Sequence, residues 1–116
     1  MKTLKLGVIG CGAISDGKYL PSLKAVGGNE VVAFCDLIEQ RAVDAATKFG
    51  TSDARVYVDY KKLLAKETDI EVVHVCTPNR CHAPITIAAL EAGHHVMCEK
   101  PMAKTYAEAC DMLAAA

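Results

Sequence analysis

The stretch that decides the fold is LKLGVIGCGAIS, residues 4–15. Its first half, residues 4–9, is rich in aliphatic side chains and predicts a strand. Gly10 and Gly12 follow in a GxGxx pattern, with Ser15 where a third glycine or alanine is usual. Gly10 permits a tight turn, and Gly12 lets backbone N–H groups approach a phosphate at the amino end of a following helix. Alone this pattern is weak evidence for a phosphate-binding turn, so the segments around it have to show whether it is one.

Short apolar runs alternate along the chain with longer segments of helical period. The runs predict strands at LKLGVI (4–9), EVVAFC (30–35), RVYV (55–58), EVVHVC (71–76) and HVMCE (95–99). Three of them are apolar on both faces, as strands are in a parallel sheet that helices cover on two sides.

The first helix is expected directly after the glycine-rich turn. Pro21 lacks a backbone N–H donor, so it predicts a break near Tyr19 and Leu20 and a restart at Pro21 itself. Gly27 and Gly28 are placed to close this helix.

Later helices are predicted by apolar spacing and by their end signals. Alanines and Phe49 share one face over residues 42–49, and Gly50 is placed to end that helix in a left-handed conformation. Pro84 suits the first turn of another helix, which Gly93 stops. A last helix is predicted by a capping box of Thr105 and Glu108, which stands ahead of Ala109, Met112 and Leu113.

This series predicts an α/β fold with a doubly wound parallel sheet of the Rossmann type, in the strand order 3-2-1-4-5. Such a sheet normally continues to a sixth strand, whereas residues 114–116 end the chain inside or just after a helix. We therefore expect the front portion of something longer. The fifth strand would then be an open edge that could pair with a second copy, giving a homo-oligomer.

Composition excludes several classes of protein. The chain has 116 residues, 52% of them hydrophobic and 23% charged, which is typical of one folded domain. Its net charge of −1 makes nucleic acid and anionic membranes unexpected partners. The six cysteines include no CxxC pair and no zinc-like spacing, which predicts reduced thiols, no metal site and a cytoplasmic location. No segment approaches the roughly 20 apolar residues that span a membrane.

Asp36 ends the second predicted strand, where an acid can accept hydrogen bonds from the ribose hydroxyls of a dinucleotide. With strand, turn, helix and acid in register, the pattern indicates a dinucleotide site rather than a glycine-rich turn without a ligand. A carboxylate repels a 2′-phosphate, so NAD is favoured over NADP. NADP stays open because Arg41 could pair with a phosphate or stack on adenine, although the solvated face of its helix is the favoured position.

A second polar group follows the fourth predicted strand, in CTPNRCHAP (76–84). It lies at the carboxyl end of that strand, the edge where open α/β sheets bind ligands. The nicotinamide side is therefore expected near Cys76, Thr77, Pro78, Asn79 and His82. His82 could equally be a capping or surface histidine. The other histidines are interpreted as structural: His74, His94 and His95.

The segment HHVMCEKPMAKT (94–105) places Glu99 and Lys100 at the end of the fifth predicted strand. An ammonium there could hold a reacting hydroxyl and stabilise charge as hydride leaves, and burial tends to lower the pKa of a lysine toward useful acid–base values. The alternative is a solvated lysine paired with Glu99. The residues alone favour that alternative.

Four segments together resemble, in order and spacing, the nucleotide-binding half of the Gfo/Idh/MocA oxidoreductases (glucose-fructose oxidoreductase, inositol dehydrogenase, rhizopine catabolism protein). They are GVIGCGAIS (7–15), Asp36, CTPNRCH (76–82) and EKPMAKT (99–105). The resemblance spans essentially the whole chain, and EKP is its most specific element. It implies a dehydrogenase that moves hydride between a nicotinamide and a hydroxyl or carbonyl carbon of a sugar, polyol or related small molecule.

The resemblance also implies roles for individual residues. Lys100 would be catalytic, and Glu99 and Pro101 would position it. The remaining cofactor contacts would come from Gly10, Cys11, Gly12, Ala13, Ile14, Asp36, Cys76, Thr77, Pro78, Asn79 and His82. Two departures limit these assignments. Ser15 crowds the helix against the first strand, and the second domain, which in the family supplies the substrate pocket and further acid–base residues, is absent.

Two functional hypotheses follow from different classes. In the first, residues 1–116 are the NAD(P)-binding domain and a fragment of a longer two-domain enzyme, which binds cofactor but does not turn over a sugar or polyol by itself. In the second, the chain is a non-catalytic dinucleotide-sensing or interaction module that reports the redox state of NAD to a partner. The front domain of a biliverdin or dihydrodipicolinate reductase is disfavoured by the complete EKP.

Overall fold

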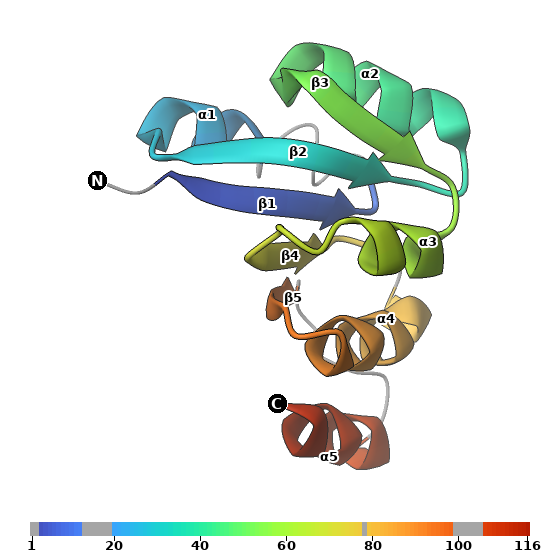
Figure 1. Ribbon diagram of the computed structural model, residues 1–116. Helices are drawn as coiled ribbons and strands as arrows, with labels where there is room; N and C mark the ends of the chain where they lie inside the picture. The colour runs from blue at the N-terminus through green and yellow to red at the C-terminus, as the bar shows by residue number, and fades with distance from the viewer. Residues whose placement is uncertain (1–2, 13–19, 78, 99–105) are drawn as a thin grey trace.

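The computed structural model describes residues 3–12, 20–77, 79–98 and 106–116 of the chain. Its strands are β1 (Leu4–Ile9), β2 (Asn29–Cys35), β3 (Gly50–Tyr57), β4 (Val72–Val75) and β5 (His95–Cys98). Its helices are α1 (Leu20–Val26), α2 (Glu39–Phe49), α3 (Tyr60–Lys66), α4 (Asn79–Glu91) and α5 (Tyr106–Ala115). Strands and helices alternate along the chain, as the sequence predicts (Figure 1).

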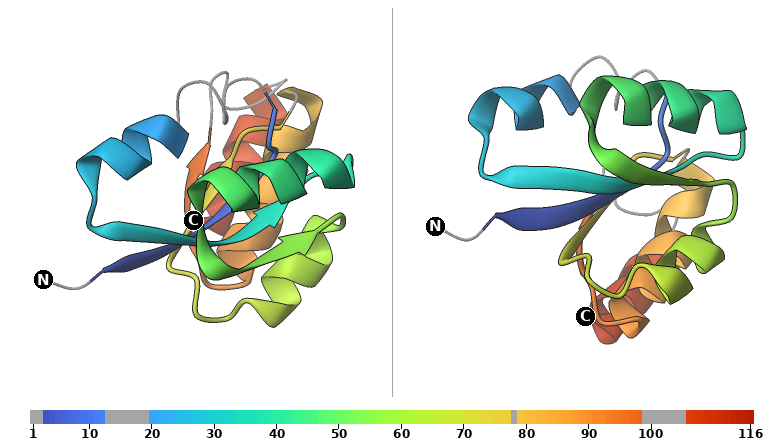
Figure 2. Two further views of the ribbon diagram at one scale, coloured as in Figure 1. Left: turned by 90° about the horizontal axis from the view of Figure 1, so that it is seen from above. Right: turned by 45° about the horizontal axis from the view of Figure 1, so that its top comes forward.

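The strands form one parallel sheet in the order β3-β2-β1-β4-β5, which confirms the predicted fold class and strand order. Helices α1 and α2 cover one face of this sheet, and α3 and α4 cover the other (Figure 1 and Figure 2). Helix α5 lies outside α4 and packs against it (Figure 1). Within the described ranges, no helix has the length and apolar character needed to cross a membrane.

Two apolar clusters, one on each face of the sheet, hold the helices in place. Beneath α1 and α2 the buried cluster is Leu6, Val8, Cys11, Leu20, Val31, Phe34, Ala42 and Ala45. Against α3 and α4 it is Ile9, Val32, Ala33, Cys35, Leu63, Leu64, Ile70, Val73, Val75, Ile85 and Ala89. Full burial of one large aliphatic or aromatic side chain contributes about 2 kcal/mol. The central strands are therefore the most firmly held part of the molecule, and the candidate site lies at their ends.

Gly50 does not end α2 in the left-handed conformation that the sequence predicts. Its φ is −83° and its ψ is 168°, so it is extended and opens β3. The position needs a glycine for lack of space, because a Cβ would lie 2.7 Å from both the Ala46 carbonyl oxygen and the Phe34 ring. β3 is consequently longer than the predicted RVYV strand (55–58) and ends at Tyr57. Its polar first half lacks the apolar pattern that reveals a strand.

Three other glycines end helices as predicted. Gly27 and Gly28 follow α1 with φ of +73° and +74°, and Gly93 follows α4 with φ of +92°. These left-handed values are those that glycine adopts without strain. The described part of α1 starts at Leu20 and includes Pro21, so the predicted restart at Pro21 is not tested by the described residues.

Helix α4 begins at Asn79, well before the predicted first turn at Pro84. Pro84 lies inside the helix, where it removes one hydrogen bond, the one to the carbonyl group of Arg80. The sequence prediction began the helix too late because a proline is best tolerated in a first turn. As a result, the first turn of α4 follows directly on the segment after β4.

The last predicted helix is present as α5. Met112 on it is buried, and Leu113 is 70% exposed. The helix break near Tyr19 and the cap at Thr105 lie outside the described residues.

Helix α3 was not predicted from the sequence. It is seven residues long, too short to show two full apolar periods. Its signals are local: the Asp59 side chain accepts a hydrogen bond of 2.9 Å from the Lys61 backbone N–H, and Leu63 and Leu64 are buried.

Candidate functional site

The carboxyl ends of the three central strands meet at one edge of the sheet. The Gly10 N–H donates to the Cys35 carbonyl oxygen at 2.8 Å, and the Cys76 N–H donates to the Ile9 carbonyl oxygen at 2.8 Å. β5 ends at Cys98, which pairs with Val75 at the end of β4. The segments after β1, β2 and β4 therefore lie side by side at the edge where parallel sheets bind ligands.

Gly10 is required by its own geometry. Its φ is +98°, and a Cβ would lie 2.7 Å from the Cys76 backbone carbon and oxygen and 2.8 Å from the Thr77 nitrogen. Backbone atoms cannot move aside as a flexible side chain can, so this close contact between the ends of β1 and β4 admits glycine alone. A Cβ on Gly12, in contrast, would meet no described atom within 4 Å. Packing against the described residues does not demand Gly12, and those residues leave the space beside it open to a ligand.

Asp36 connects the end of β2 to the glycine-rich turn. Its Oδ2 accepts a hydrogen bond of 2.8 Å from the Cys11 backbone N–H, and its Oδ1 accepts one of 2.8 Å from the Ile38 N–H. Its own N–H donates to the Tyr57 carbonyl oxygen at 3.1 Å. The half-buried carboxylate is thus held in one orientation and adds negative charge next to the turn.

Exposed apolar side chains, which were not predicted from the sequence, lie close to Asp36 along the chain or after the neighbouring strand. Leu37 and Ile38 follow it directly and are 89% and 51% exposed, and Val58, the residue after β3, is 44% exposed. The available signal was two aliphatic residues directly after the acid, outside any predicted strand or helix. Arg41 is exposed on α2, the favoured one of the positions considered for it.

The cysteines at this edge are buried thiols. The Cys11 Sγ donates to the Cys35 carbonyl oxygen at 3.5 Å. Burial, with a further contribution from the charge of Asp36, raises the pKa of Cys11 and of Cys35 to about 12. Both thiols are therefore protonated at neutral pH. A cysteine that acts as a nucleophile or metal ligand has to be a thiolate, so neither thiol suits such a role. In the described part of the chain, no three His, Cys, Asp or Glu side chains gather as a metal site.

The structure brings together one part of the predicted site. Gly10, Cys11, Gly12, Asp36, Cys76 and Thr77 meet at the carboxyl edge. Asn79 and His82 lie in the first turn and a half of α4, which starts from the same edge. The other predicted contacts lie outside the described residues: Ala13, Ile14, Pro78, Glu99 and Lys100.

The remaining histidines lie away from this edge. His74 is buried within β4, opposite Val8 and Met97. His94 is buried before β5, and its Nδ1 lies 2.7 Å from the Ile70 carbonyl oxygen. His95 is exposed at the first position of β5.

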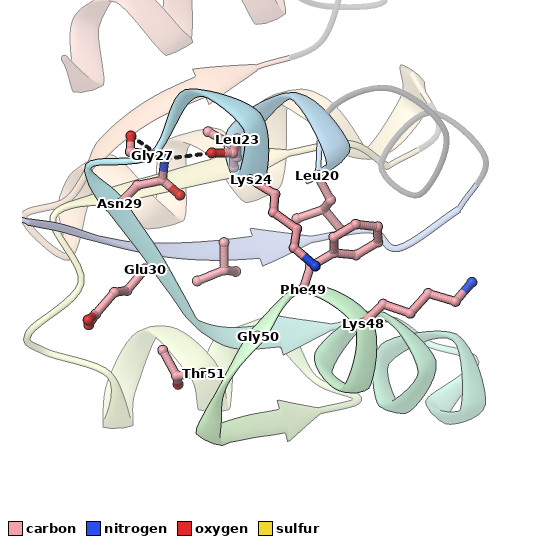
Figure 3. Close-up of a pocket in the computed structure, with 11 residues that line it drawn as sticks. Leu20, Leu23, Lys24, Gly27, Asn29, Glu30, Lys48, Phe49, Gly50 and Thr51 are labelled. Atoms are coloured by element: carbon pink, nitrogen blue, oxygen red, sulfur yellow. Dashed lines mark hydrogen bonds between the residues drawn. The ribbon is translucent and has the colours of Figure 1, made fainter.

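A cavity of about 290 Å³ opens at the opposite edge of the sheet (Figure 3). Residues from the end of α1, the start of β2 and the junction of α2 with β3 line it, among them Leu23, Lys24, Phe49 and Thr51. The strands begin there, so the cavity is separated from Gly10 and Asp36 by the length of the sheet. None of the sequence-predicted site residues that the structure describes lines it.

Comparison with known proteins agrees with this geometry. Residues 4–116 match the family described as "Oxidoreductase family, NAD-binding Rossmann fold", the Gfo/Idh/MocA family. The chain belongs to this family. The resemblance predicted from the sequence is confirmed, and so is the assignment as an NAD-binding Rossmann domain.

Among curated members of the family, the inositol 2-dehydrogenase of Salmonella typhimurium is 41% identical over 106 residues, which are 91% of this chain and 31% of that protein. The D-glucoside 3-dehydrogenase of Escherichia coli is 42% identical over 110 residues, 94% of this chain and 30% of that protein. The chain thus spans about a third of the length of the curated relatives that it matches.

Solved structures in the family share the fold. A 3-ketoreductase from Actinomadura kijaniata, in complex with NADP and TDP-benzene, has a TM-score of 0.87 and 32% identity over 98% of this chain and 34% of that one. The WlbA dehydrogenase from Bordetella pertussis, in complex with NADH and UDP-GlcNAcA, has a TM-score of 0.88 and 27% identity over 98% of this chain and 34% of that one. The family therefore includes proteins crystallised with either dinucleotide.

Proposed function

We propose that this chain is the cofactor-binding domain of a dehydrogenase that transfers hydride between a nicotinamide and a hydroxyl or carbonyl carbon of a sugar, polyol or related small molecule. The observation that carries the proposal is the joining of the glycine-rich turn to Asp36 at the carboxyl edge of the sheet. The names of the curated relatives, an inositol and a glucoside dehydrogenase, support the substrate class.

In this proposal the pyrophosphate lies over the open space beside Gly12, near the backbone of residues 10–14. Asp36 accepts hydrogen bonds from the adenosine ribose, since each carboxylate oxygen can take a second donor beyond the amide that it already accepts. Leu37, Ile38 and Val58 offer an apolar surface for the adenine. The nicotinamide lies toward the end of β4 and the start of α4, near Cys76, Thr77, Pro78, Asn79 and His82.

NAD supplies the hydride acceptor when it is bound. Lys100 would hold the oxygen of the reacting hydroxyl, stabilise its charge as hydride leaves and take part in moving its proton. Glu99 would orient that ammonium. Because the chain spans about a third of its relatives, the substrate pocket is proposed to come from another part of a longer protein, and this chain alone is proposed to bind cofactor without turnover.

NAD is the proposed cofactor rather than NADP. Asp36 carries a carboxylate at the proposed ribose position, and two exposed apolar side chains, Leu37 and Ile38, follow it. A 2′-phosphate would meet the negative charge of Asp36 there, which disfavours NADP.

Titration with NADH and NADPH, followed by nicotinamide fluorescence, tests the proposal. We expect NADH to bind more tightly than NADPH by about tenfold or more, the size of one repulsive charge contact. No binding of either dinucleotide at millimolar concentration would rule out the proposed function. Tighter binding of NADPH would rule out the cofactor preference alone.

A further inference from the structure

Asp36 makes more contacts with its own protein than ribose recognition requires. Both of its carboxylate oxygens accept a backbone N–H, Oδ2 from Cys11 and Oδ1 from Ile38, each at 2.8 Å. The Cys11 amide belongs to the glycine-rich turn, and the Ile38 amide belongs to the segment after β2. The side chain therefore connects two loops by hydrogen bonds, the one that follows β1 and the one that follows β2.

The contact with Cys11 is accompanied by two other hydrogen bonds between the described part of the turn and the end of β2. The Gly10 N–H donates to the Cys35 carbonyl oxygen at 2.8 Å, and the Cys11 Sγ donates to the same carbonyl group at 3.5 Å. The Cys11 side chain is only 5% exposed. The Asp36 bond is the one of the three that carries a charge, and such hydrogen bonds are the strongest.

We propose that Asp36 is a positioning residue for the glycine-rich turn, in addition to its contact with the ribose. By holding the Cys11 N–H, it fixes the direction of the peptide group between the two glycines of the turn and so the backbone surface that faces the pyrophosphate. This inference rests on the proposed function, because it assumes that a dinucleotide binds at this edge.

The two roles differ in what they predict for ligands without ribose hydroxyls. If Asp36 only binds the ribose hydroxyls, its removal does not lower the affinity for a nucleotide that lacks the 2′ and 3′ hydroxyls. If it also positions the turn, its removal weakens the binding of every ligand that uses the pyrophosphate site. The two roles also differ for Asp36→Asn, since one oxygen of the carboxylate becomes an NH2 group that faces a backbone N–H donor.

The experiment compares ADP with 2′,3′-dideoxy-ADP by calorimetry on the wild-type chain, Asp36→Ala and Asp36→Asn. Loss of one hydrogen bond predicts about a fivefold or larger fall in the affinity for 2′,3′-dideoxy-ADP in both variants. Asp44→Ala removes an exposed carboxylate from α2 and serves as the matched control, with unchanged affinities. Equal affinity of wild type and Asp36→Ala for 2′,3′-dideoxy-ADP would overturn the inference.

A second readout does not depend on ligand binding or on a large loss of stability. In the wild-type chain, the Cys11 amide should exchange its hydrogen slowly, and Asp36→Asn should speed this exchange by about tenfold or more, while amides in the middle of β1 keep their rates. Unchanged Cys11 exchange in Asp36→Asn would contradict the positioning role. Failure of the wild-type chain to bind ADP would instead contradict the proposed function, and the exchange result would still decide on the positioning role.

Discussion

At the scale of single residues, the two glycines of the turn have different roles. Gly10 has a left-handed φ of +98° and lies against the backbone of Cys76 and Thr77, so its role is to let β1 and β4 end side by side. A Cβ on Gly12, in contrast, would contact none of the described residues. The sequence pattern predicts a glycine at both positions but does not separate the structural role from the ligand-facing one.

Substitution of each glycine by alanine should separate these roles. Gly10→Ala should lower the free energy of unfolding by about 2 kcal/mol or more, from left-handed strain and from contact with backbone atoms. Gly12→Ala should leave stability within about 0.5 kcal/mol while weakening NADH binding. Urea unfolding and the NADH titration measure the two effects, and equal loss of stability in both variants would contradict this division.

Much of the candidate site at this scale could be predicted from the sequence, because glycines and an acid in register with strands have few other uses. The Cys11 amide bond to Asp36 could not, since it depends on the lateral distance between the ends of β1 and β2. The apolar surface of Leu37 and Ile38 was missed because aliphatic side chains are normally read as core.

At the scale of elements, the edge strand β3 is anchored to α3 by one polar cluster. Glu67, at the end of α3, accepts hydrogen bonds from the Arg55 guanidinium and from the Tyr57 hydroxyl. Its side chain is 7% exposed, whereas Arg55 is 45% exposed. β3 has a strand neighbour on one side only, so this cluster supplies part of the lateral support that an inner strand receives from its second neighbour.

Glu67→Gln should destabilise the domain by about 1–2 kcal/mol at pH 7, a value reduced by the solvent exposure of Arg55. The hydrogen bond from Arg55 holds the pKa of Glu67 below its ordinary value. A lowered folded-state pKa gives stability that is present above the unfolded value of about 4.3 and is lost as the pH falls through the folded value. The difference between wild type and variant should therefore shrink below about pH 4 in urea unfolding.

The exposed Glu91→Gln on α4 is the control for this pH dependence. A constant difference between wild type and Glu67→Gln from pH 7 to pH 3 would show that the charge of Glu67 contributes nothing.

There are physical reasons why some elements could not be predicted from the sequence. The first half of β3 is polar because it lies at the edge of the sheet, so it shows no apolar run. α3 is shorter than two full apolar periods. Gly50 looks like a helix end, but its small size is needed against Phe34 and Ala46, which depends on tertiary packing. The inner strands were predicted well because both of their faces are buried.

At the scale of the whole molecule, the five-stranded parallel sheet has two distinct edges. The carboxyl edge gathers the glycine-rich turn, Asp36 and the start of α4, and the amino edge holds the cavity beside Leu23 and Phe49. The chain covers about a third of its curated relatives, which are named dehydrogenases. We therefore expect cofactor binding but no oxidation of inositol or glucosides by this chain alone, and NADH formation that is lost on Lys100→Ala would contradict that expectation.

The most direct test of the central claim is to map the backbone amides that respond to NAD, by recording nitrogen–proton correlation spectra of the labelled chain during a titration. We expect the largest shifts at the carboxyl edge, on the amides of Gly10, Cys11, Gly12, Ile38 and Thr77. The resonances of amides beside the cavity at the opposite edge should not shift. These are the amides of Leu23, Gly27 and Thr51. Shifts that gather at the cavity, with the glycine-rich turn unmoved, would contradict the assignment of the site.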